Sequence, residues 1–196
     1  MGLDIHATNN LTKIPKEDIP YGVEPYNDKF YQWEQDMDVY LRYIDRSNGE
    51  GENYWSKHSD PFETGYYMLD GSDYHTFRAG SYTYYSNWRK MLALTMGFDD
   101  MEDVWSLDPY DATVPFIELL NFSDSSGRIG PLVSAELYND FVTMEDKVFE
   151  FIDRMSYGVV SGQKLRLGEV SDFKELYEDW KYAFELAKEG GEVMLM

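Results

Sequence analysis

The chain has no cysteine and only three histidines among its 196 residues. Without cysteine it can form no disulfide, thiolate nucleophile or cysteine-ligated zinc site, which fits a reducing compartment. His6, His58 and His75 lack the i, i+4 spacing of a helical zinc motif, so we expect no metal and no cofactor. A meeting of His6 and His75 on adjacent strands is the arrangement that would challenge this expectation.

Positive charge is also scarce, with 17 lysines and arginines against 37 acidic residues and a net charge of −20. Binding to nucleic acid or to an anionic membrane needs a basic face, so we expect neither as a partner. The acidity fits a solvated surface, a basic protein partner or mimicry of the charge pattern of DNA.

Long apolar runs are missing, because no stretch approaches the roughly 18 residues of a membrane span. The first ten residues lack the basic cluster and apolar run of a secretory signal. We therefore expect neither a membrane span nor secretion.

Aromatic residues are abundant instead, at 17% of the chain within a hydrophobic content of 43%. This is enough for a core, and the length suits one domain over residues 1–196. Helical and strand patterns mix without βαβ regularity, which favours an α+β fold. We expect a mixed or antiparallel sheet packed with about four helices, and a long irregular insertion around residues 46–73.

The clearest elements lie at the two ends and in the middle of the chain. Residues 3–7 alternate as a strand and residues 193–196 are a second terminal strand, so we expect both in one sheet. Ser81 and Gly97 bracket a predicted helix over residues 82–96. An apolar stripe predicts another helix over residues 172–188. Residues 30–45 carry both helical and strand spacings.

Two loops combine arginine with glycine just before predicted helices. The predicted ligand-binding residues are Arg78, Ser81, Tyr82, Trp88, Asp124 and Arg128. A guanidinium beside a helix N-terminus suits an anion, and aromatic rings suit stacking. We expect residues 78–81 and 124–128 to converge on one concave site. The alternative leaves Arg78 paired with a carboxylate and Asp124 organising only its own turn. Helical spacing also predicts that Trp88 and Trp180 lie in the core.

The sequence offers little support for a catalytic motif. The sequence after Gly80-Ser81 has Thr83 where a nucleophile elbow needs glycine, and there is no phosphate-binding glycine motif. Carboxylates are too numerous to single out a catalytic pair.

Four blocks together resemble a family of uncharacterised small proteins encoded by tailed bacteriophages and prophages. The blocks are MGLDI, FRAGSY, PFIELLNFSD followed by a GxIGP segment, and WxxAFELA followed by two glycines. The resemblance covers about half of the chain and implies a phage accessory protein made in a bacterial cytoplasm.

The function expected from these features is non-catalytic binding of a small polar or nucleotide-like ligand, with a role in counteracting host defence. One alternative is an acidic interaction module or DNA mimic that inhibits a host enzyme. A second is a hydrolase that uses carboxylates or a metal.

Overall fold

The computed structural model describes residues 2–45, 56–69, 73–111, 113–155 and 167–196. These residues form six α-helices and two antiparallel sheets, which confirms the α+β class. The strands are β1 (Gly2–Thr8), β2 (Leu11–Lys13), β3 (Leu41–Ile44), β4 (Gly65–Leu69), β5 (Tyr74–Ser81), β6 (Gly127–Ile129) and β7 (Glu192–Leu195). The helices are α1 (Asp28–Met37), α2 (Tyr82–Met96), α3 (Met101–Trp105), α4 (Ile117–Asn121), α5 (Pro131–Met155) and α6 (Leu167–Ala187), with short 3-10 turns η1 (Lys16–Asp18) and η2 (Ser56–Ser59).

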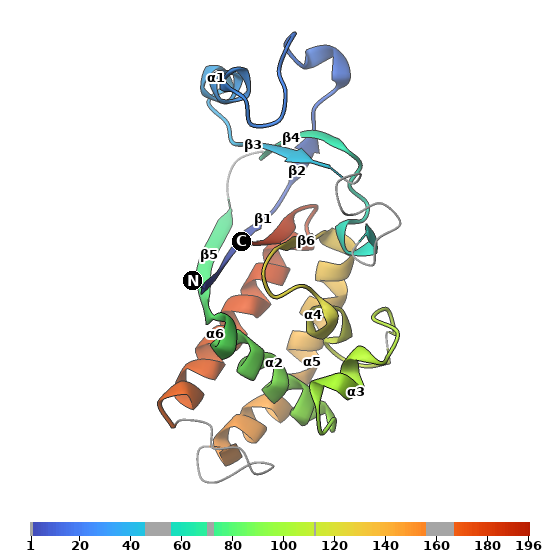
Figure 1. The fold of residues 1–196 in the computed structure, drawn as a ribbon, viewed down its shortest axis with the longest axis vertical. Helices are drawn as coiled ribbons and strands as arrows, with labels where there is room; N and C mark the ends of the chain where they lie inside the picture. The colour runs from blue at the N-terminus through green and yellow to red at the C-terminus, as the bar shows by residue number, and fades with distance from the viewer. Residues whose placement is uncertain (1, 46–55, 70–72, 112, 156–166) are drawn as a thin grey trace.

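The larger sheet has the strand order β5-β1-β7-β6 and contains both terminal strands, as predicted. β1 pairs with β7, so that Ile5 lies opposite Leu195, and the two chain ends lie close together (Figure 1). Alternation along β1 buries Leu3, Ile5 and Ala7 against the helices. Asp4, His6 and Thr8 consequently point to the opposite face, here called the outer face.

Helices α2, α5 and α6 cover the inner face of this sheet. Ser81 accepts a hydrogen bond from the backbone N–H of Tyr84, and Gly97 ends α2 with a φ of 96°, as predicted. Trp88 and Trp180 are fully buried and stacked with ring centroids 6.0 Å apart, which confirms their place in the core. α6 begins at Leu167, five residues before the predicted start.

The smaller sheet has the order β2-β4-β3 and sits with α1 at the other end of the molecule (Figure 1). The two spacings in residues 30–45 are both real, because a helix, α1, is followed directly by a strand, β3. Phe30, Trp33, Leu41 and Tyr66 form a small core that is separate from the main one. Within the predicted insertion, residues 65–69 form strand β4, and residues 46–55 and 70–72 lie outside the described residues.

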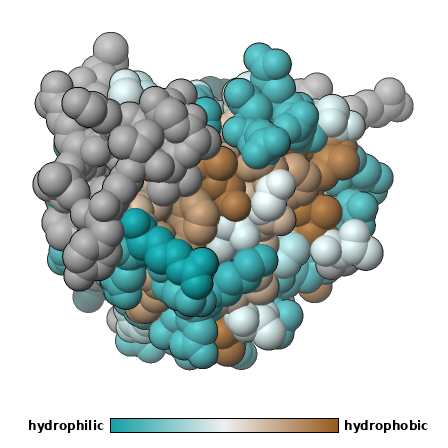
Figure 2. Space-filling view, turned by 90° about the horizontal axis from the view of Figure 1, so that it is seen from below, coloured by the Kyte–Doolittle hydropathy of each residue, from teal (hydrophilic) through white to brown (hydrophobic). Residues whose placement is uncertain are grey.

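The helical end of the molecule is viewed in Figure 2, where hydrophobic side chains reach the surface among hydrophilic ones. On α3, Trp105 is 55% exposed. In the described parts of the chain, no helix has both the length and the apolarity to cross a bilayer.

Candidate functional site

The two predicted ligand loops do not come together. Arg78 lies on β5 and Arg128 on β6, at opposite edges of the larger sheet. Arg78 forms an ion pair with Asp4 at 3.5 Å, and its side chain is 62% exposed. The prediction of one concave site built by residues 78–81 and 124–128 is therefore wrong. Local sequence placed each loop before a helix, but strand order separated them.

The other predicted residues mostly have structural partners. Ser81 caps α2, and Tyr82 in the first turn of α2 is partly exposed. The ring of Trp88 is enclosed, and its Nε1 donates to the carbonyl of Phe173 at 3.3 Å, so it lines no pocket.

Asp124 pairs with an arginine that the sequence did not single out. Its carboxylate lies 3.5 Å from the guanidinium of Arg89, a buried residue of α2. Arg89 also donates to the carbonyl of Phe122 at 2.8 Å and lies over the ring of Tyr85. These contacts fix the loop before β6 against the core.

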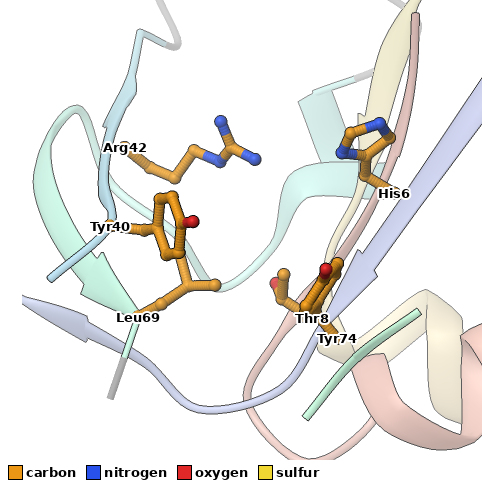
Figure 3. Close-up of a pocket in the computed structure, with 6 residues that line it drawn as sticks. All are labelled: His6, Thr8, Tyr40, Arg42, Leu69 and Tyr74. Atoms are coloured by element: carbon orange, nitrogen blue, oxygen red, sulfur yellow. The ribbon is translucent and has the colours of Figure 1, made fainter. Parts of the chain in front are cut away.

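A cavity of about 290 Å³ lies between the outer face of the larger sheet and the smaller sheet. Its lining comes from two sides, as Figure 3 shows. Strands β1 and β5 form one side of the cavity. The other side is formed by β3, the residue just before it and the last residue of β4. The lining residues are His6, Thr8, Tyr40, Arg42, Leu69 and Tyr74.

Arg42 is held from one side and open on the other. Its Nε lies 3.7 Å from a carboxylate oxygen of Glu192, which is 1% exposed. The other oxygen of Glu192 forms an ion pair with Nε of Arg128. Among the described residues, the terminal nitrogens of Arg42 have no hydrogen-bond partner, and Figure 3 shows the guanidinium reaching into the gap toward His6.

The wall formed by β1 supplies a hydroxyl and an imidazole. Thr8 is 4% exposed, and within the described part of the chain its hydroxyl has no hydrogen-bond partner. A buried hydroxyl without a partner is costly, and a polar ligand group would remove that cost. Burial, and then the nearby charge of Arg42, lowers the pKa of His6 below 6.5. His6 is consequently mostly neutral at pH 7.

The turn between α6 and β7 brings these groups together. Gly190 adopts a φ of 81°, and a Cβ on Gly191 would collide with the carbonyl oxygen of Thr8. The paired glycines of the last sequence block thus allow β7 to lie tightly beside β1. This approach places Glu192 opposite Thr8.

Sequence reasoning missed Arg42, Tyr40 and Glu192. One signal was available: alternation of Val39, Leu41 and Tyr43 places Tyr40 and Arg42 on the other face of the strand. An arginine there is notable in a chain with so few cations. Nothing local marks Glu192 among 37 acidic residues.

Other titratable clusters are enclosed or dispersed. His75 bonds Asp179 at 3.1 Å on the inner face, so it does not meet His6 on the outer face. In the described ranges, no group of three or more histidines and carboxylates is placed to hold a metal ion. Glu118 is buried in α4, and burial raises its pKa.

The cavity therefore combines a partly buried cation, a buried unpaired hydroxyl, a neutral imidazole and two tyrosines. That set can bind an anion and a ring through hydrogen bonds and stacking. Comparisons with models of known protein families, with curated proteins and with solved structures find no match for this chain.

Proposed function

We propose that the protein is a non-catalytic binder of a small anion that carries a planar ring, held in the cavity between the two sheets. The observation that carries this proposal is the state of Arg42. Glu192 anchors its Nε side, and within the described residues its terminal nitrogens have no partner and reach into the cavity. A guanidinium oriented in this way is a ready fork for two oxygens of one anion.

The rest of the lining supports the same ligand. The hydroxyl of Thr8 can donate to the anion, which would satisfy a buried polar group. Tyr40 and Tyr74 are 74% and 68% exposed at the edge of the cavity, where their rings can flank a planar group. A volume of about 290 Å³ suits one ring with one anionic group and excludes a polymer.

The biological setting proposed is that of a phage accessory protein in a bacterial cytoplasm. Its support is the resemblance carried by the four sequence blocks. A protein that sequesters a nucleotide-like signal would modulate host defence without catalysis. The alternative of an acidic interaction module rests on net charge alone.

The test is a thermal-shift and calorimetry screen of wild-type protein and Arg42→Gln. The probes are aromatic carboxylates, aryl phosphates, nucleotides, free adenosine and inorganic phosphate. We expect stabilisation by anions that carry a ring and little from adenosine or phosphate alone. Loss of a charge-assisted pair costs about 1.5–3 kcal/mol, so Arg42→Gln should weaken binding about 10- to 100-fold.

Arg78→Gln is the matched control. Arg78 lies on the outer face of the same sheet, and it is an exposed arginine that pairs with Asp4 away from the cavity lining. It should leave binding unchanged. Equal binding by wild type and Arg42→Gln would remove the cavity as the site, and no stabilisation by any probe would remove the proposed function.

A further inference from the structure

Glu192 is a buried carboxylate between two arginines. Its side chain is 2% exposed, and the side chains of Arg128 and Arg42 are 13% and 27% exposed. Arg128 holds one oxygen closely, while Arg42 lies 3.7 Å from the other. The tighter pair therefore neutralises Arg128 first, and most of the positive charge of Arg42 remains for the cavity.

Among the described residues, the charged groups of this cluster sum to a single positive charge beside the cavity. Arg42 and Arg128 contribute two positive charges, Glu192 contributes one negative charge, and His6 is mostly neutral at pH 7. Because these groups are partly buried, the electrostatic interactions of their charges are stronger than they would be in water.

The charge of Asp4, which also acts on His6, is offset by an ion-pair partner. Asp4, on the same strand, pairs with Arg78 on β5, and both side chains are about half exposed. Solvent screens such a pair strongly. Tyr40 and Tyr74, from the two sides of the cavity, add hydroxyls.

We infer that the cavity selects a singly charged oxyanion on a ring, a carboxylate or a phosphodiester, over a doubly charged phosphate monoester. This inference rests on the proposed function. One net positive charge balances one negative charge. A second negative charge would lose its hydration in the cavity without gaining a partner.

Calorimetry at pH 8 with three phenyl probes tests this inference. Phenyl phosphate is doubly charged there, because the second pKa of a phosphate monoester is about 6. Its methyl ester and benzoate carry one charge on the same ring, and they separate the phosphodiester from the carboxylate. We expect the better of these two to bind on the order of tenfold more tightly than phenyl phosphate.

Glu192→Gln should reverse this preference. It removes the cancelling charge, so the doubly charged probe should gain at least tenfold relative to its methyl ester. Glu189→Gln is the matched control, since Glu189 is exposed in the turn just before β7 and its replacement changes the net charge equally. Glu189→Gln should leave the preference as it is in wild type.

A pH series on wild type decides the matter even if Glu192→Gln does not fold. Phenyl phosphate becomes singly charged below about pH 6, so its affinity should approach that of the methyl ester. The ester keeps its charge and reports the titration of the protein alone, His6 included. Tighter or equal binding of phenyl phosphate at pH 8 overturns the charge selection. Failure of every probe to bind wild type overturns the proposed function instead.

Discussion

The indole of Trp180 lies at the centre of a stack of aromatic rings. Its neighbours are Tyr85 at 5.7 Å, Trp88 at 6.0 Å and Phe184 at 5.5 Å between ring centroids, all within 25° of parallel. Because the ring is closely packed on both faces, its neighbours cannot move in to fill the cavity that its removal would leave. The stack ties α2 to α6, and these helices support the sheet that carries the cavity.

Trp180→Ala should therefore lower the free energy of unfolding by about 3–5 kcal/mol, measured by urea titration. Trp105→Ala is the control, because Trp105 is 55% exposed, and it should cost no more than about 0.5 kcal/mol. Equal losses in the two variants would show that the stack contributes nothing beyond an ordinary surface ring.

At the scale of elements, the short helix α4 is held by carboxylates. Asp140 of α5 accepts a hydrogen bond from the backbone N–H of Phe116 at 2.7 Å, where Phe116 has a left-handed φ of 63° just before α4. Burial raises the pKa of Asp140 to about 6. Burial also raises the pKa of Glu118, inside α4, and the charges of Glu136 and Asp140 add to the effect.

These raised pKa values give a stability that falls as the pH rises. Above pH 4.5, the usual pKa of a glutamate, the folded state binds more protons than the unfolded state. The free energy of unfolding therefore decreases with rising pH until Glu118 is ionised in the folded state as well. His58 acts oppositely below pH 6.5, because burial lowers its pKa to about 4.

Glu118→Gln removes the buried charge and should flatten this dependence. Urea unfolding should show wild type and variant nearly equal at pH 5, and the variant more stable by about 1–3 kcal/mol at pH 8. The exposed Glu102→Gln serves as the control for a general charge effect. A difference of the same size at both pH values would contradict the assignment to Glu118.

At the scale of the molecule, the net charge of −20 opposes compactness. Raising sodium chloride from 0.05 to 0.5 M shortens the Debye length from about 14 to about 4 Å. The melting temperature should therefore rise by a few degrees. The measurement uses chloride rather than sulfate, because sulfate stabilises any folded protein by favouring the burial of apolar surface. A falling melting temperature would mean that the surface ion pairs outweigh the repulsion.

The division into separate cores also belongs to this scale. The main core lies under the larger sheet, and Phe30, Trp33, Leu41 and Tyr66 form a second core beside α1. The cavity lies where these two packed units meet, so a bound ligand would contact both. A cavity at this junction can therefore exist without a gap in the packing of either core.

The sequence by itself determined several local elements and the fold class. Ser81 and Gly97 set the ends of α2, because a hydroxyl satisfies free N–H groups and glycine tolerates positive φ. Period-two alternation identified β1, and a short apolar run after two glycines identified β7. Helical periodicity placed Trp88 and Trp180 in the core. Each of these follows from interactions between residues close in the chain.

Only the tertiary structure decided where the candidate site lies. His6, Arg42 and Glu192 meet although up to 150 residues separate neighbours among them. Alternation tells which face of a strand a side chain occupies, but not which strands become neighbours. Strand order set Arg78 and Arg128 at opposite edges, and the placement of the smaller sheet brought Arg42 of β3 to the cavity that His6 and Thr8 also line. That order depends on how distant apolar faces pack together, and no local pattern encodes it.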